Sequence, residues 1–171
     1  MILPAGWRRR ACVVYGIEEP ERWFDAIPEF KTPKRRLEWM LSRIAEKELR
    51  LLGANGPHVS YSHSGAYGAA AVGNAPVGID VEIIRPLSPG TAHLFLSPSE
   101  EEVMAQCRTE HALLHFWSAK EARWKQLGGR VPTLKRVPLT LLEEREDGLL
   151  FDYAETRRTE SVVVALTRPT S

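Results

Sequence analysis

An alternating run at residues 77–84 constrains the fold more than any other segment of this sequence. Apolar residues occupy every second position from Val77 to Ile83, and the positions between them include Asp80 and Glu82. A period of two predicts a β-strand, because successive side chains on a strand point to opposite faces. The strand therefore buries one face and brings Asp80 and Glu82 together on the other, about 7 Å apart along the strand.

Two carboxylates at this spacing repel each other unless a cation lies between them. A hard cation that prefers oxygen ligands meets this need, and Mg²⁺ is the usual one where phosphates are also bound. The alternative is that both side chains form the solvated face of an edge strand. The spacing alone leaves both interpretations open.

Other patterns predict further strands and helices without a tandem repeat. A helix is expected at 34–52 from its apolar spacing, another at about 110–127, and a helix start at 97–100 from a capping sequence. Strands are expected at 11–17, 58–62, 67–73, 134–142, 149–153 and 161–167, with a hairpin turn at Asp147–Gly148. This mixture of helices and antiparallel hairpins is typical of the α+β class.

The amino-acid composition excludes several classes of function for this protein. The chain has 171 residues, 43% of them hydrophobic, with a formal net charge of +1, which fits one globular unit over 1–171 and argues against a general nucleic-acid-binding surface. No stretch approaches the roughly 20 apolar residues of a membrane helix, and the arginines at 8–10 are not followed by the apolar segment of a signal peptide. Cys12 and Cys107 suit free thiols in a reducing compartment, so we expect a cytoplasmic protein.

Charge is unevenly distributed along the chain. Residues 31–50 hold seven Lys or Arg against three Glu, and Arg36 and Arg43 lie in one arc of the predicted helix. A local basic patch on a nearly neutral protein indicates an anionic ligand such as a phosphate. A solvated helix face is the alternative interpretation.

A second group of charged residues lies on the helix predicted at about 110–127. Lys120 falls within an apolar stripe, where a lysine must either extend to solvent or meet an anion. Glu121 and Lys125 lie one turn apart, which is also the spacing of an ordinary helical ion pair. Upstream, Ser62 and His63 stand at the end of a predicted strand, where they could bind a phosphate or could form a simple turn.

Three motifs in this order resemble the 4′-phosphopantetheinyl transferase superfamily, in particular its surfactin-synthetase-type branch. Residues 60–64 (SYSHS) are similar to its S-H-S segment, residues 77–82 (VGIDVE) to its G-I-D-x-E segment, and residues 116–125 (FWSAKEARWK) to its W-x-x-K-E-A-x-x-K segment. The basic stretch from Lys34 to Arg43 is similar to the N-terminal helix of the family. The resemblance covers roughly 33–129.

The resemblance implies a role for each matched residue. Asp80, Glu82 and Glu121 would bind Mg²⁺, with Mn²⁺ as an alternative, together with the pyrophosphate of coenzyme A. Glu121 would also help to deprotonate the attacking serine, and Asp80 and Lys120 would complete the catalytic group. The residues expected to bind coenzyme A are His63, Ser62, Lys120, Lys125, Arg36 and Arg43.

The resemblance also implies a fold and a reaction. The fold has two similar β/α halves related by a pseudo-twofold axis, with antiparallel sheets that each pack on a long helix. We expect the halves at 1–74, which is shortened, and at 75–171, which holds the metal site. The reaction would transfer 4′-phosphopantetheine from coenzyme A to a serine of an apo acyl or peptidyl carrier protein and release adenosine 3′,5′-bisphosphate.

The sequence departs from this family in its N-terminal half. The Gly-Lys-Pro-like stretch before the S-H-S segment is reduced to Asn55-Gly56-Pro57. Because the basic helix and the metal motifs share one chain, we expect a monomer, without a nucleic-acid or membrane partner. Two alternatives remain: a non-catalytic relative that binds coenzyme A or a carrier protein, and a Mg²⁺-dependent nucleotide hydrolase, although the glycine-rich loop expected of the latter is missing from the sequence.

Overall fold

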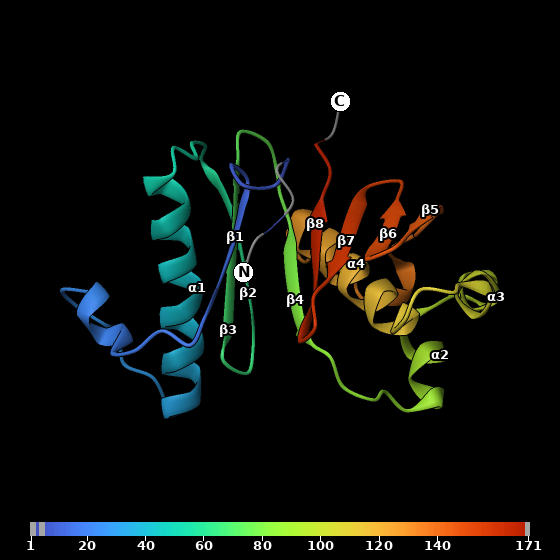
Figure 1. The fold of residues 1–171 in the computed structure, drawn as a ribbon, viewed down its shortest axis with the longest axis horizontal. Helices are drawn as coiled ribbons and strands as arrows, with labels where there is room; N and C mark the ends of the chain where they lie inside the picture. The colour runs from blue at the N-terminus through green and yellow to red at the C-terminus, as the bar shows by residue number, and fades with distance from the viewer. Residues whose placement is uncertain (1–2, 4–5, 170–171) are drawn as a thin grey trace.

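Within the described residues, residue 3 and residues 6–169, the computed structural model contains two antiparallel β-sheets (Figure 1). The strand order of the first sheet is β1 (Ala11–Tyr15), β3 (Tyr67–Gly73), β2 (His58–Ser64). The strand order of the second sheet is β4 (Ile79–Ile83), β8 (Val162–Thr167), β7 (Ala154–Arg158), β6 (Gly148–Phe151), β5 (Leu141–Arg145). The sheets are therefore built from separate parts of the chain, and β2 and β4 are edge strands.

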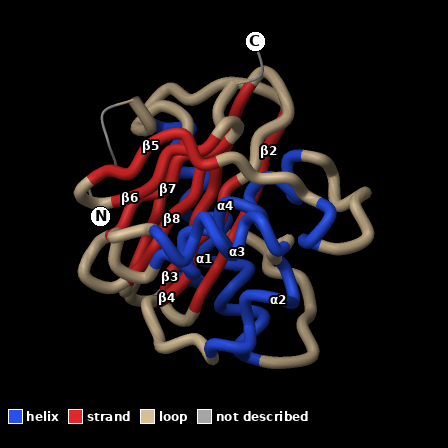
Figure 2. Tube along the Cα trace, turned by 90° about the vertical axis from the view of Figure 1, so that its right-hand side faces the viewer, coloured by secondary structure: helices blue, strands red, loops and turns tan. Residues whose placement is uncertain are grey.

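A long helix packs on the outer face of each sheet. Helix α1 (Pro33–Leu51) packs against β1 and β3, and α4 (Ala112–Gln126) packs against β4, β7 and β8. Figure 2 looks from the side of α2 (Ala92–Phe95) and α3 (Pro98–Gln106) and shows α4 in front of the second sheet. Short 3₁₀ helices lie at η1 (Pro20–Trp23), η2 (Pro89–Thr91) and η3 (Leu134–Arg136). The predicted α+β class, with antiparallel sheets that each pack on a long helix, is confirmed.

The inner faces of the two sheets pack against each other and form the central core. Its buried members are mostly small or β-branched: Leu3, Trp7, Ala11, Val13, Ala69, Ala71, Val77, Ile79, Val81, Val162, Val164 and Leu166. The outer faces form separate cores with the helices, one around Leu41 and Ile44 of α1 and one around Phe116 of α4. The result is a stack of helix, sheet, sheet and helix (Figure 1).

Most predicted elements form within a few residues of their expected bounds. The helix start at Ser97 is a capping box, in which the Ser97 hydroxyl accepts the Glu100 N–H and the Glu100 carboxylate accepts the Ser97 N–H. The strand predicted at 134–142 is wrong, because η3 occupies its first residues and β5 begins only at Leu141. Pro138 lies within this stretch and cannot donate to a strand ladder.

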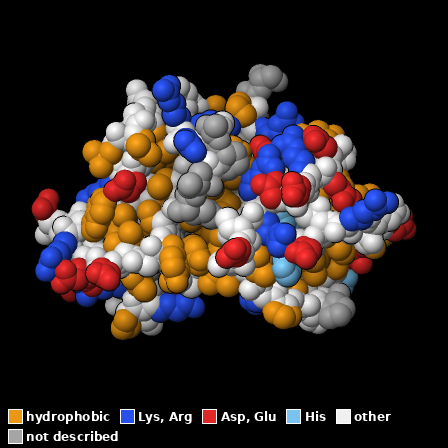
Figure 3. Space-filling model, in the orientation of Figure 1, with side chains coloured by type: hydrophobic (Ala, Val, Ile, Leu, Met, Phe, Trp, Pro, Cys, Tyr) orange, Lys and Arg blue, Asp and Glu red, His pale blue; other side chains and the backbone are white. Residues whose placement is uncertain are grey.

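Charged side chains of both signs lie side by side over the half of the molecule that holds the second sheet (Figure 3). Arg145 and Arg157 both pair with Glu155 there, at N···O distances of 2.5 and 2.6 Å. In the part of the chain that the structure describes, no helix has the length and apolar composition needed to cross a membrane.

Candidate active site

Asp80 and Glu82 lie on β4 and point away from the central core. Ile79 and Val81, the alternate residues of the same strand, are fully buried between the sheets. Helix α4 packs on the opposite face of β4 and brings Glu121 to the same side as the two carboxylates. The predicted alternation of β4 therefore explains why Asp80 and Glu82 face α4.

Burial and neighbouring charge raise the pKa values of two of the three carboxylates, Glu82 and Glu121. Burial, and then the negative charge of Asp80, raise the pKa of Glu82 above its ordinary value. Burial is also the largest cause that raises the pKa of Glu121, followed by Asp80, whereas Lys125 acts in the opposite direction. Buried like charges are unfavourable unless a cation balances them. The group formed by Asp80, Glu82 and Glu121 therefore favours the binding of a cation.

Lys125 neutralises part of the negative charge of these carboxylates. Its Nζ lies 2.8 Å from Asp80 Oδ1, 3.0 Å from Ser62 Oγ and 3.1 Å from the carbonyl oxygen of Ile79. Asp80 is only 4% exposed, and its other oxygen, Oδ2, is buried without a hydrogen-bond partner. An unpaired buried carboxylate oxygen is costly, and it is an open acceptor for a cation.

The donor set fits Mg²⁺ in chemical type, since it consists of carboxylate oxygens beside an unpaired acceptor. However, no group of three or more His, Cys, Asp or Glu side chains among the described residues is arranged as a ready-made metal site. Lys125 occupies one oxygen of Asp80, and protein donors occupy both oxygens of Glu82. The residues therefore fit Mg²⁺ by type, while among the described residues their side chains are not gathered into a metal site.

A ladder of serine hydroxyls joins β2 to β4. The hydroxyls of Ser60, Ser62 and Ser64 accept the backbone N–H groups of Ile79, Val81 and Ile83 at 3.1, 3.2 and 3.1 Å. Because β4 is an edge strand, these N–H groups have no partner strand on that side, and the hydroxyls satisfy them. Two of these hydroxyls also donate to carboxylates: Ser62 to Asp80 Oδ1 at 2.9 Å, and Ser64 to Glu82 Oε2 at 3.2 Å.

The other oxygen of Glu82 is bound by an aromatic residue of α4. Trp117 Nε1 donates to Glu82 Oε1 at 3.2 Å. Trp117 and Ser64 lie within the sequence motifs, but neither was expected to contact Glu82. The Ser-x-Ser-x-Ser alternation of residues 60–64 could have predicted the contact of Ser64, because it places three hydroxyls on one face of β2.

His63 faces the other side of β2, toward α1. Its Nδ1 lies 3.5 Å from Glu38 Oε1, and its side chain is about half exposed. It borders a cavity of about 520 Å³ lined by Phe30, Arg35, Glu38, Trp39, Ser42, Arg43, Tyr61 and His63. The Arg43 guanidinium stacks over the Tyr61 ring at 3.6 Å from its centroid, whereas Arg36 is exposed near the start of α1 and is not among these lining residues.

The structure does not bring Lys120 together with the other predicted site residues. Lys120 is fully buried, and its Nζ lies 2.7 Å from Glu100 Oε2 and 3.4 Å from the carbonyl oxygen of Leu134. Glu100 is the capping-box residue of α3. Of the two alternatives for Lys120, extension to solvent or contact with an anion, the structure shows the second, and the anion is a carboxylate of this chain.

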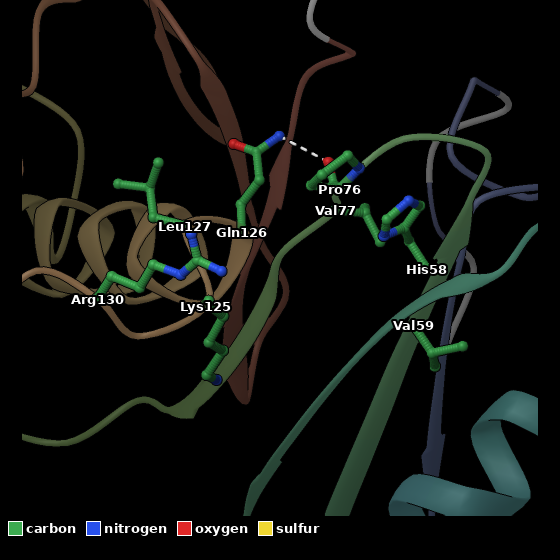
Figure 4. A pocket seen from close by; sticks show the side chains of 9 residues that line it. His58, Val59, Pro76, Val77, Lys125, Gln126, Leu127 and Arg130 are labelled. Atoms are coloured by element: carbon green, nitrogen blue, oxygen red, sulfur yellow. Dashed lines mark hydrogen bonds between the residues drawn. The ribbon is translucent and has the colours of Figure 1, made fainter.

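Lys125 also borders a second cavity, of about 350 Å³, between the start of β2 and the end of α4 (Figure 4). Figure 4 shows Lys125 and Arg130 on one side of this cavity, His58 and Val59 on the other, and the hydrogen bond from Gln126 to the carbonyl oxygen of Pro76 at 2.9 Å. Lys125 thus lies between the carboxylate group and an open cavity.

Comparison with known proteins identifies relatives of this chain. The family model of the 4′-phosphopantetheinyl transferase superfamily matches residues 76–162, which include β4 and α4. The chain is 42% identical over 74 residues to the 4′-phosphopantetheinyl transferase psf-1 of Bacillus pumilus, a match that covers 42% of this chain and 32% of that protein.

Two further relatives come from Bacillus subtilis. The chain is 35% identical over 74 residues to the 4′-phosphopantetheinyl transferase ffp and 36% identical over 74 residues to the 4′-phosphopantetheinyl transferase Sfp of strain 168. Each match covers 42% of this chain and 33% of the relative, so the matched segment spans about a third of these proteins. The resemblance to the surfactin-synthetase-type branch is thereby confirmed, and the chain belongs to the 4′-phosphopantetheinyl transferase superfamily.

Proposed function

We propose that this protein transfers the 4′-phosphopantetheine group of coenzyme A to a serine of an apo acyl or peptidyl carrier protein and releases adenosine 3′,5′-bisphosphate. The observation that carries the proposal is the group of three carboxylates, Asp80 and Glu82 on β4 and Glu121 on α4, in which Asp80 Oδ2 is buried and unpaired. Burial and the charge of Asp80 raise the pKa values of Glu82 and Glu121. The family membership of residues 76–162, which contain all three carboxylates, supports it.

In this proposal Asp80, Glu82 and Glu121 hold Mg²⁺, with Mn²⁺ as an alternative. Bound there, the metal ion would neutralise the pyrophosphate of coenzyme A and stabilise the charge that develops on the leaving group. Residues of the protein would position the reactants and accept the proton. Glu121 accepts the proton of the attacking serine, directly or through one water molecule, which requires the hydroxyl to come within about 3 Å of the acceptor.

Coenzyme A would lie along the two faces of β2. Lys125 and Ser62 would bind its phosphates beside the carboxylates, and Lys125 would exchange Asp80 for a phosphate oxygen. His63 and Arg43 would bind phosphate from the cavity next to α1, with Arg36 at its exposed margin. Lysine, arginine and protonated histidine make charge-assisted hydrogen bonds to phosphate, which are the stronger class.

Lys120 enters the proposal as a positioning residue. Its buried ion pair with Glu100 connects α4 to the start of α3, and its contact with Leu134 connects α4 to η3. We infer that Lys120 fixes the part of α4 that carries Glu121, rather than contacting coenzyme A. The proposal further places the protein in the cytoplasm as a monomer whose partner is the carrier protein.

The test is intact-mass spectrometry of apo carrier proteins after incubation with this protein, coenzyme A and Mg²⁺. The panel spans fatty-acid, polyketide and non-ribosomal-peptide carriers, and a matched reaction contains EDTA. We expect one phosphopantetheinyl group to be added, and EDTA to prevent the addition. Glu121→Gln should abolish transfer, whereas Glu102→Gln, an exposed change on α3, should leave it unchanged.

The main competing function is a relative that binds coenzyme A or a carrier protein without turnover. The pairing of Lys125 with Asp80 favours this function, because the lysine occupies a carboxylate oxygen that a metal ion would need. Calorimetry distinguishes the two functions. Binding of coenzyme A without modification of any carrier would contradict the transferase proposal and support the non-catalytic one.

A further inference from the structure

Glu82 is held by two side chains that the proposed reaction does not use. Trp117 Nε1–H donates to Glu82 Oε1, and the Ser64 hydroxyl donates to Glu82 Oε2, each at 3.2 Å. Every carboxylate oxygen can accept more than one hydrogen bond or metal contact. Both oxygens are therefore oriented by the protein and still have lone pairs to offer.

These three residues lie on three different elements. Ser64 ends β2, Glu82 lies on β4 and Trp117 lies on α4. The Ser64 hydroxyl is itself fixed, because it accepts the Ile83 N–H at 3.1 Å. Trp117 is held by packing, because its ring and the Phe95 ring form a T-shaped pair with ring centroids 5.0 Å apart. A flexible glutamate side chain thus lies between two donors that cannot easily move.

We propose that Ser64 and Trp117 are positioning residues that hold the Glu82 carboxylate in the orientation needed to bind a divalent cation. The proposal rests on the proposed function, in which Glu82 binds the metal ion. Groups that hydrogen-bond to metal ligands orient those ligands, and their loss typically weakens metal binding 10- to 100-fold. Two donors from separate elements also explain why Glu82 needs no cationic partner to stay in place.

The chain offers a matched control for each residue. Ser60 accepts the Ile79 N–H at 3.1 Å, as Ser64 accepts that of Ile83, but among the described residues it has no bond to a carboxylate. Trp124 lies on α4, as Trp117 does, and its Nε1 donates to the carbonyl oxygen of Val131 at 2.8 Å. Ser60→Ala and Trp124→Phe therefore remove an equivalent strand contact and an equivalent indole donor away from Glu82.

The first measurement is the dissociation constant for Mn²⁺, obtained without coenzyme A from the electron paramagnetic resonance signal of the free ion. We expect Ser64→Ala and Trp117→Phe each to weaken Mn²⁺ binding by about 10-fold or more. Ser60→Ala and Trp124→Phe should stay within about twofold of the unsubstituted protein. Equal losses for Ser64→Ala and Ser60→Ala would overturn the proposal, because Ser64 would then act only by joining the strands.

The second measurement needs no metal. The chain contains five tryptophans, and ¹H–¹⁵N spectra resolve their indole N–H groups, with Trp117→Phe assigning the relevant resonance. Glu82→Ala should shift that resonance in the metal-free protein, and Ser64→Ala should shift it less. An unmoved resonance in Glu82→Ala would overturn the positioning role. A shifted resonance in a protein that binds no Mn²⁺ would support the Trp117–Glu82 contact and count against the metal in the proposed function.

Discussion

His115 is a fully buried histidine, and only one of its two ring nitrogens has a hydrogen-bond partner. Its Nδ1 lies 2.8 Å from Thr156 Oγ1, and its Nε2 is buried without a partner. Burial, with smaller contributions from Arg158 and His111, lowers the pKa of His115 from 6.5 to about 4. The folded protein therefore holds a neutral imidazole at a pH at which the unfolded chain already binds a proton.

This difference predicts acid sensitivity. Because the folded-state pKa is lowered, stability is lost as pH falls from about 6.5 toward 4. Between pH 7.5 and pH 5 we expect a loss of about 2 kcal/mol from this residue. His115→Gln should reduce the difference between urea unfolding free energies at the two pH values, whereas His58→Gln, an exposed change, should preserve it. An unchanged difference in His115→Gln would contradict the assignment.

His63 has a different environment and a different expected effect. It lies beside Glu38 at the edge of the cavity next to α1, about half exposed. We expect His63→Ala to weaken coenzyme A binding about 10- to 150-fold, since a hydrogen bond to a charged group contributes about 1.5–3 kcal/mol, with little effect on stability. Calorimetry measures the affinity, and His58→Ala at the start of the same strand is the control. Equal affinities for the His63→Ala and unsubstituted proteins would refute the role.

At the residue scale, the sequence predicted which neighbouring residues share a face of an element. It could not predict contacts between residues of different elements. The alternation in 77–84 correctly predicted that Asp80 and Glu82 share a face, because a strand period is local. The apolar stripe around Lys120 predicted that this lysine either extends to solvent or meets an anion, yet it could not identify Glu100 as that anion. That carboxylate lies twenty residues earlier on another helix, and only tertiary packing brings the two together.

At the scale of elements, the approach of α4 to β4 decides where Glu121 lies. Gly78, just before β4, makes this approach possible, because a Cβ atom there would lie 1.8 Å from the carbonyl oxygen of Ala122. Gly78 is also fixed from the other side, since its N–H donates to Thr167 Oγ1 at 2.8 Å. A side chain at position 78 must therefore move the backbone of α4.

Gly78→Ala is expected to destabilise the protein by about 1–3 kcal/mol, the usual cost of overpacking, and to weaken Mn²⁺ binding by displacing Glu121 from Asp80. Urea unfolding and Mn²⁺ titration measure the two effects. Gly90→Ala is the control, because the nearest atom to its Cβ would be 3.9 Å away. A Gly78→Ala protein with unchanged stability and metal affinity would show that α4 does not rely on this close contact.

Strand β7 shows why some elements escape prediction. Its sequence, Ala154–Arg158, is largely charged, and only Ala154 and Thr156 are fully buried. Glu155 and Arg157 pair with each other on the opposite face. A strand with paired, partly buried charged side chains on one face lacks a strong apolar alternation. It forms because β6 and β8 already offer hydrogen-bonding edges on both sides.

At the scale of the whole molecule, the two sheets depend on each other. Their inner faces bury Val13, Ala69 and Ala71 against Ile79 and Val164. Polar contacts cross the same boundary, including Arg10 Nη2 to the carbonyl oxygen of Thr167 at 2.8 Å and Trp7 Nε1 to Glu155 at 3.1 Å. Separation of the halves would expose both an apolar face and the unpaired N–H groups of β4.

We therefore predict that the pieces 1–74 and 75–171 do not fold alone. The shorter piece has only a three-stranded sheet and one long helix, and below about 80 residues a single core rarely supplies enough stability. Each piece should show poorly dispersed amide resonances and no cooperative unfolding, whereas co-expressed pieces should associate and regain both. The carboxylates of 75–171 would then bind Mn²⁺ only in the reassembled protein, because Ser62 and Ser64 come from the other piece. Cooperative unfolding of isolated 75–171, with Mn²⁺ affinity intact, would mean that the site needs neither β2 nor its serines.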